Sequence, residues 1–308
     1  MADGMLSGLM TELEKQVQDE ILQGVIETIV STDEIFNVLP FRKVEGSGLK
    51  VTWEKQIPEA AFIDPTDTIP QSEGAKLDQF VETVRVIARN IDIPKFATEV
   101  EGAPVLPFIK GEIKAMSRAY RKAMFTGDST ADPKVFDGLQ RQVARIEAKG
   151  LQRSIDAGSK PLAFSMLDEL LALMKLGVDA IVMHPRAYIA YKELLRSEGH
   201  GTDSAMLQLK NFGKPVLTFD GIPVLQSEYA PIKTDADGNV LTEIYALHFS
   251  VADGVTGLYG GTGGAGIQYK KLGEVPDKLA VRYRFEWYCG FTVLSPYAVA
   301  AVKNAKVG

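Results

Sequence analysis

Cysteine is almost absent, since the 308-residue chain contains only Cys289. One cysteine excludes an intrachain disulfide and a cysteine-based metal cluster. Its place within a strand pattern indicates a small core residue. Histidine is also scarce, and His184, His200 and His248 fit neither an HExxH helix nor a paired ligand spacing. The sequence therefore predicts no metal site and no cofactor.

Long apolar runs are missing as well. No stretch approaches the length needed to span a bilayer, and the start at Met1–Gly4 lacks the basic flank of a signal peptide. The net charge of −6 argues against a general nucleic-acid binder, because neutralising phosphates requires a basic surface. These features predict a soluble protein made in a cytosol.

No set of catalytic residues is apparent in the sequence. The glycine-rich stretch 260–266 lacks the Lys and Ser/Thr that complete a phosphate-binding P-loop. A possible calcium loop at 235–238 has Lys233 at its first ligand position and Ile244 in place of the closing glutamate. No GxSxG elbow is present, and Asp168 and Glu169 suit the start of a helix. We therefore expect a protein that is not an enzyme and has no catalytic or cofactor-binding residues.

The most informative feature present is a predicted β-hairpin. Alternation in 49–55 and in 80–91 indicates two strands rich in β-branched and aromatic residues. The polar tip 64–74 contains turn-forming residues that end the pairing. Arms of about fifteen residues would reach roughly 50 Å. An isolated two-stranded ribbon is marginal in water, so this one must pack either on its own sheet or on a neighbouring subunit.

If a neighbouring subunit covers the ribbon, its apolar side chains are the contacts. A second candidate is the N-terminal segment 6–30, whose apolar residues recur at four-residue steps typical of an amphipathic helix. The candidate inter-subunit contacts are Trp53, Phe62, Ile63, Ile69, Val84 and Val86 from the hairpin, with Leu13 and Val17 from the N-terminal segment.

The stretch 107–125 predicts a basic amphipathic helix. Its apolar residues follow helical spacing on one side. A charged face of this kind is usually just solvated, but it could touch packaged nucleic acid if the helix lines a container. The candidates for such a face are Lys114, Arg118, Arg121 and Lys122.

The second half of the chain alternates between helices and strands. Ser165 is predicted to cap a helix, 180–183 a buried strand, and 185–195 a helix. A hairpin turn is expected at 237–239, and strict alternation marks 281–293 as the clearest strand. This pattern indicates a mixed α+β fold.

The order of these elements resembles the major capsid proteins of tailed bacteriophages, which have the Hong Kong 97-like shell fold shared with encapsulins. Short sequence motifs similar to those of this family lie at 125–128, 136–139, 180–187, 220–224 and 294–296. The resemblance implies an α+β fold divided into five parts. They are an N-terminal arm (1–36), an extended loop and its base (37–94), a peripheral domain with a long spine helix (95–160), an axial domain (161–275), and a carboxy-terminal strand that returns to the peripheral domain (276–308).

The resemblance also implies a function. Many copies would form pentamers and hexamers of an icosahedral shell enclosing double-stranded DNA in a virion, after synthesis in a host bacterial cytoplasm. Its partners would be a scaffolding protein, a portal and a decoration protein, with no membrane. Lys50, Lys55 and Lys76 lie in the loop, but the closing strand has no asparagine, so a non-covalent shell is expected. The alternatives are an encapsulin compartment and, less favoured, a soluble metabolic enzyme.

Overall fold

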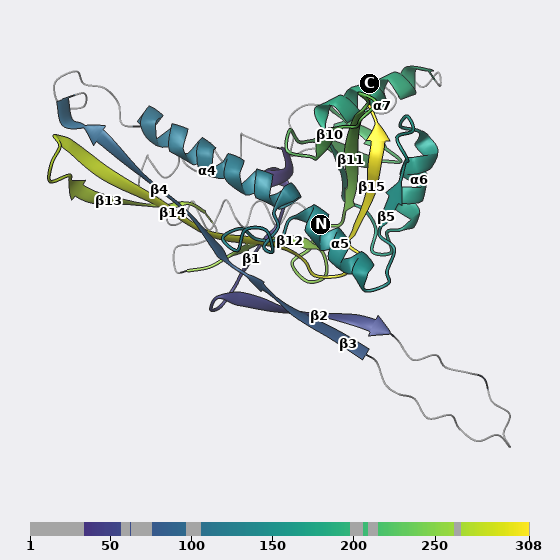
Figure 1. Cartoon of the computed structure of the whole chain (residues 1–308), viewed down its shortest axis with the longest axis horizontal. Helices are drawn as coiled ribbons and strands as arrows, with labels where there is room; N and C mark the ends of the chain where they lie inside the picture. Colours follow the sequence, from purple (N-terminus) through teal and green to yellow (C-terminus); the bar gives the residue numbers. More distant parts are fainter. Residues whose placement is uncertain are drawn as a thin grey trace.

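A computed structural model describes residues 34–56, 62, 76–96, 106–197, 206–208, 215–261 and 266–307. The described chain contains two β-sheets, one flanked by a single long helix and the other by three helices, and a separate hairpin (Figure 1). This arrangement confirms the predicted α+β class. No helix in the described ranges is long and apolar enough to cross a membrane.

The first sheet has five strands in the order β1-β12-β14-β13, with β4 also paired to β14. In β14 the side chains of Phe285, Trp287, Cys289, Phe291 and Val293 are all buried, as the alternation predicted. The strands are β1 (Phe41–Lys43), β4 (Arg85–Pro94), β12 (Val255–Tyr259), β13 (Gln268–Glu274) and β14 (Ala280–Val293), and the short 3-10 helix η1 (Glu34–Asn37) precedes them.

Helix α4 (Leu106–Thr126) lies along this sheet, beside β4 and β14 (Figure 1). Its predicted apolar stripe is buried, and Tyr120 lies at the centre of that stripe. The Tyr120 ring lies 4.7 Å from the Trp287 ring, and its hydroxyl donates a 3.0 Å hydrogen bond to the Gly290 carbonyl. The helix is therefore fixed to the sheet along one side.

The second sheet has eight strands in the order β5-β15-β11-β6-β9-β8-β7, and β10 pairs with β11. Its strands are β5 (Ser154–Asp156), β6 (Ala180–Met183), β7 (Met206–Gln208), β8 (Pro215–Phe219), β9 (Ile222–Gln226), β10 (Ile232–Thr234), β11 (Val240–Leu247) and β15 (Val299–Lys306). Helices α5 (Leu139–Ala148), α6 (Phe164–Ala172) and α7 (Pro185–Ser197) accompany it. The predicted buried strand 180–183, the helix from Pro185 and the hairpin turn at 237–239 are confirmed.

The cap predicted at Ser165 is wrong. Helix α6 begins at Phe164, so its N-cap residue is Ala163, which makes no side-chain capping bond.

The predicted domain boundaries do not coincide with the division of the strands between the two sheets. Strands β12 and β13 precede residue 275 but pair with β14, whereas β15 follows β14 and pairs with β11 and β5 in the other sheet. Strand pairing joins distant segments, and sequence order alone did not indicate these partners.

The hairpin consists of β2 (Gly48–Gln56) and β3 (Lys76–Thr83), which pair antiparallel with Val51 opposite Phe80. Figure 1 shows it extending away from both sheets. The predicted second arm, 80–91, is wrong as a single strand, because the chain leaves the hairpin at Val84 and continues as β4 along β14. Within the described residues the paired strands are nine and eight residues long. The tip 64–74 lies outside the described residues.

Two glycines allow the turn after α4 to close tightly on itself. The Gly138 amide donates a 2.9 Å hydrogen bond to the Gly127 carbonyl. A Cβ atom added at Gly127 would lie 2.3 Å from the Phe136 carbonyl oxygen, and one at Gly138 would lie 2.3 Å from the Ala123 carbonyl oxygen. Both contacts involve backbone, which cannot move aside cheaply.

We therefore expect Gly127→Ala to lower the free energy of unfolding by about 1–3 kcal/mol, the usual cost of overpacking. Gly111→Ala is the matched control, because nothing lies within 4 Å of its added Cβ and the residue is exposed within α4. That substitution should stabilise the protein by about 0.5–1 kcal/mol through helix propensity. Urea unfolding of the two variants tests this contrast, and an equal effect of both would contradict it.

Candidate assembly site

The hairpin is anchored at its base by Trp53. The indole is 4% exposed, and its Nε1 donates a 2.8 Å hydrogen bond to the Leu294 carbonyl, just beyond the end of β14. The Phe80 ring meets it edge-on with centroids 4.5 Å apart. Trp53 was predicted to contact another subunit, and that prediction is wrong, because its own chain covers the side chain.

A buried charge lies beside this anchor. The Glu82 carboxylate accepts a 3.0 Å hydrogen bond from the Gln142 amide and another from the Arg145 guanidinium. Arg145 also stacks on the hairpin aromatics, with its guanidinium carbon 4.0 Å from the Phe80 ring centroid and 5.5 Å from that of Trp53. A buried carboxylate is strongly destabilising without its partners. The pair therefore fixes the position of the hairpin relative to α5.

Helix α5 connects the hairpin to the second sheet. On one side Lys149 forms a 2.5 Å ion pair with Asp78 of the hairpin. On another side Glu147 bonds to Ser154 and to Lys303 of β15, the latter at 2.9 Å. Gln140 donates a 2.9 Å hydrogen bond to Glu243 of β11. One ten-residue helix thus sets the hairpin direction relative to the larger sheet.

The Glu147 contacts predict a pH effect. Burial opposes ionisation of Glu147, but hydrogen bonds from Ser154 and Lys303 outweigh it and hold its pKa below the ordinary value. A lowered folded-state pKa stabilises the protein above the unfolded pKa, and that stabilisation disappears as the pH falls through the folded value.

We expect Glu147→Gln to cost roughly 1 kcal/mol of unfolding free energy at pH 7 and much less near about pH 3. Urea unfolding of wild type and variant across this range measures the difference. Asp237→Asn, on the exposed β10–β11 turn, serves as the control. A constant difference between wild type and Glu147→Gln at all pH values would contradict this assignment.

One face of the hairpin packs on its own chain, and the opposite face is open to solvent. Val51, Trp53 and Glu82 point inward and are buried, whereas Thr52 and Val81 point outward. Val81 is 60% exposed, and sequence reasoning missed it. The signal was available, because side chains two residues apart share one face of a strand and Val81 is out of phase with Phe80. The base of the ribbon therefore packs on its own chain through one face only.

The other contact candidates divide into exposed, half-buried and undescribed residues. Phe62 is fully exposed and Val86 largely so, whereas Val84 is half-buried. These placements leave Phe62 and Val86 available for a neighbouring copy. Ile63, Ile69, Leu13 and Val17 lie outside the described residues and remain predictions.

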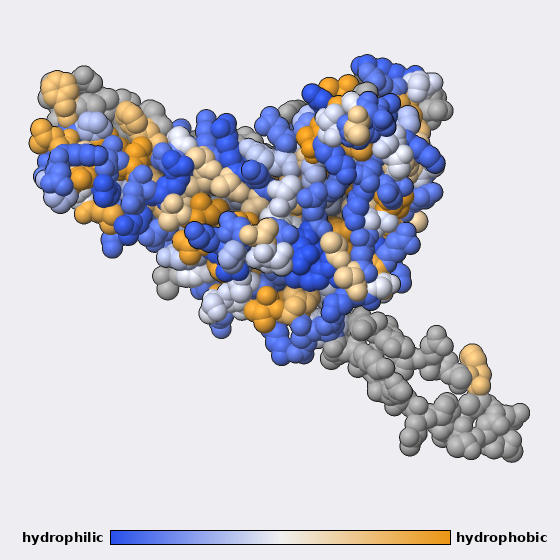
Figure 2. Space-filling view, viewed as in Figure 1, coloured by the Kyte–Doolittle hydropathy of each residue, from blue (hydrophilic) through white to orange (hydrophobic). Residues whose placement is uncertain are grey.

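A second exposed apolar surface lies at the far end of the first sheet. There the Lys95 amide donates a 2.9 Å hydrogen bond to the Leu279 carbonyl, and Leu279 is 83% exposed. Phe96 and Leu272 are exposed in the same region. Figure 2 shows hydrophobic residues at this end of the molecule, opposite the hairpin. The chain thus exposes apolar side chains at both extremities.

The predicted basic face needs one correction. Lys114, Arg118 and Lys122 are exposed. Arg121 is buried, with its Nε donating a 3.3 Å hydrogen bond to the Ser117 carbonyl and its guanidinium 4.8 Å from the centroid of the Tyr229 ring. Its assignment to a genome-facing surface is therefore wrong. The helix turns this residue toward the second sheet rather than toward solvent.

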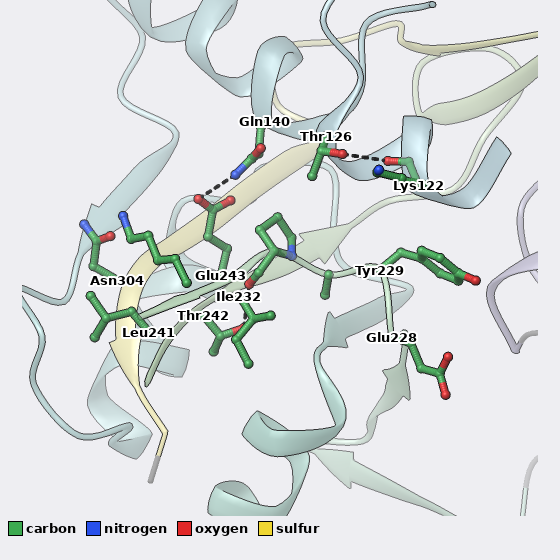
Figure 3. A pocket seen from close by; sticks show the side chains of 13 residues that line it. Lys122, Thr126, Gln140, Glu228, Tyr229, Ile232, Leu241, Thr242, Glu243 and Asn304 are labelled. Carbon is green, nitrogen blue, oxygen red and sulfur yellow. Dashed lines mark hydrogen bonds between the residues drawn. The ribbon is translucent and has the colours of Figure 1, made fainter. Parts of the chain in front are cut away.

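A cleft of about 450 Å³ lies where the end of α4 meets β10 and β11 (Figure 3). Several polar groups lining it are bonded within the chain, as in the Gln140–Glu243 bond and the Thr126 hydroxyl to Lys122 carbonyl bond. The Thr242 hydroxyl likewise donates to the Pro231 carbonyl at 2.9 Å. The Gln140–Glu243 bond joins α5 to β11, whereas the other two bonds are local to α4 and to the β10–β11 hairpin. Among the described residues, no group of three or more His, Cys, Asp or Glu side chains could hold a metal ion.

Comparison with known proteins identifies the family. A family model described as type 2A encapsulin shell protein, SrpI-like, matches residues 140–308, which is more than half of the chain. The chain belongs to this SrpI-like family. The match includes α5 and the second sheet, together with β12, β13 and β14 of the first sheet. No curated protein sequence matches the chain.

Similar solved structures cover nearly the whole length of this SrpI-like protein, including the part before residue 140. The holo-SrpI encapsulin complex from Synechococcus elongatus PCC 7942 is 18% identical, with a TM-score of 0.66 over 89% of this chain and 87% of that one. The capsid of an empty GTA particle is 16% identical, with a TM-score of 0.65 over 89% and 90%. The Mycobacterium phage Bobi structure is 12% identical, with a TM-score of 0.60 over 96% and 97%. The predicted Hong Kong 97-like shell fold is confirmed.

Proposed function

We propose that the chain is a structural protein, without enzymatic activity, whose copies build the pentamers and hexamers of a closed icosahedral shell. The fold is that of shell-forming proteins. The observation that carries the proposal is the hairpin, which is fixed at its base by Trp53 and Arg145 and extends away from both sheets. A ribbon of this kind gains stability when its exposed face lies across an adjacent copy.

We further propose that the shell encloses double-stranded DNA, as the major capsid protein of a tailed phage in its virion. The likeness to the Mycobacterium phage Bobi structure over 96% of this chain supports this choice. A separate scaffolding protein, a portal and a decoration protein would then complete the particle, with non-covalent contacts between copies. The second candidate is a cytoplasmic compartment that encloses a protein cargo, which the SrpI-like family match favours.

The contents of purified particles separate the two candidates. Particles isolated from the native source are treated with nuclease and then opened, and their DNA and co-purified proteins are quantified. The proposal predicts nuclease-resistant DNA of uniform length and no stoichiometric enzyme. A DNA-free particle that holds one abundant protein cargo would instead establish the compartment. A persistent monomer would contradict both candidates.

A further inference from the structure

Four cations form one row along α4. Lys110, Lys114, Arg118 and Lys122 follow one another at four-residue intervals, so they lie on one side of the helix. At a rise of about 1.5 Å per residue, neighbouring charges stand about 6 Å apart along the axis and the row spans about 18 Å. The buried stripe through Ile113 and Tyr120 holds another side of the helix against β4 and β14. The sheet therefore fixes the direction of the row.

The row carries uncompensated charge. Lys114, Arg118 and Lys122 are exposed and Lys110 is half-buried, and none of the four forms an ion pair with any described residue. The one acidic residue of α4, Glu112, is paired with Arg89 of β4 instead. A chain with a net charge of −6 thus carries a continuous positive strip. Such a local concentration suits a polyanion rather than a neutral partner.

We propose that the row Lys110, Lys114, Arg118 and Lys122 is the surface that contacts the phosphate backbone of the enclosed double-stranded DNA. This inference rests on the proposed function. With both strands counted, double-stranded DNA carries one charge per about 1.7 Å of its axis, or about ten phosphates over about 18 Å of duplex. The four cations need only the part of these phosphates that faces the row. The row lies along the helix surface and contacts phosphates without entering a groove, so binding is independent of base sequence.

The proposal predicts a specific salt dependence. Four phosphate contacts give a slope of log affinity against log salt of about −3.6, and removing two of them should reduce it to about −1.8. Each phosphate contact raises the affinity roughly eightfold when the salt concentration falls from 1 M to 0.1 M. A variant that loses two contacts should therefore bind DNA roughly 60-fold more weakly than wild type at 0.1 M salt. Both quantities depend on the row and not on shell formation.

The test uses the full-length chain, with assembled particles removed by size exclusion, and a fluorescent mixed-sequence duplex of about 30 base pairs as the probe. Anisotropy titrations between about 50 and 200 mM salt compare wild type with the double variant Lys114→Gln/Arg118→Gln. The control is Lys160→Gln/Lys271→Gln, which removes the same charge from exposed positions outside α4. Nuclease-resistant DNA per particle is measured for the same three proteins.

A reduced slope and about 60-fold weaker binding in the row variant, with the control unchanged, would support the inference. Equal slopes in all three proteins, or an equal loss in the control, would overturn it. A change of protein cargo without a change in DNA binding would also overturn it, by assigning the row to an acidic protein. Failure to form shells, with the slope change intact, would instead count against the proposed function alone.

Discussion

Trp53→Ala is expected to lower the free energy of unfolding by about 3–5 kcal/mol, the usual cost of removing a fully packed tryptophan. The indole is buried against Phe80 and Arg145, and its Nε1 satisfies the Leu294 carbonyl. Deleting it opens a cavity at the point where the hairpin meets β14. The loss should be visible as a lower midpoint in urea unfolding with an unchanged slope.

Trp53→Phe is the matched control. It keeps much of the aromatic packing but removes the indole N–H, so it should cost about 1–2 kcal/mol, mainly from the unpaired carbonyl. The difference between the two variants separates packing from hydrogen bonding. If Trp53→Ala were no more destabilising than Trp53→Phe, the anchor would not depend on packing. Particle yield should fall in the same order, because a loosened base lets the hairpin change direction.

Phe62→Asp should have the opposite profile, with normal monomer stability and a large loss of particles. The side chain is fully exposed in the single chain, so a carboxylate there costs the monomer little. If a neighbouring copy buries the phenyl ring, the substitution forfeits about 1.5–3 kcal/mol per subunit, with the cost of desolvating a charge in addition. That loss is repeated at every equivalent contact in the shell.

The experiment measures circular dichroism, urea unfolding and sedimentable particle yield side by side. Phe62→Leu keeps an apolar side chain and should retain most of the yield, which makes it the control for a specific apolar contact. Unchanged yield from Phe62→Asp would show that this position makes no contact between copies. A loss of monomer stability would show that the residue belongs to its own core.

The spacing of apolar residues predicted the helices and strands that bury only one side. The stripe of α4 and the alternation of β14 could be identified because each places apolar side chains at the period of its own structure. The break at Val84 could not be identified in this way. Both β3 and β4 are rich in β-branched residues, and what divides them is a change of pairing partner from β2 to β14. Pairing partners are not encoded in a local pattern.

Charged residues were harder to place than apolar ones. Glu82 and Arg145 have the character of solvated surface residues, yet they meet in the structure because Glu82 shares the inward face of β3 with Phe80. Arg121 was assigned to a genome-facing surface, although it follows Ser117 by one helical turn on the buried side of α4. In each case the position of the residue relative to the neighbouring apolar residues predicted its burial better than its charge did.

The central claim is that each copy holds the base of its hairpin while another copy covers the exposed part. A cryo-EM map of assembled particles measures this directly at Phe62 and Val81. The account predicts closed shells in which both side chains are buried by a neighbouring copy, while Trp53 keeps its bond to Leu294 of its own chain. Shells in which Phe62 and Val81 remain in solvent, or fold back onto their own subunit, would contradict it.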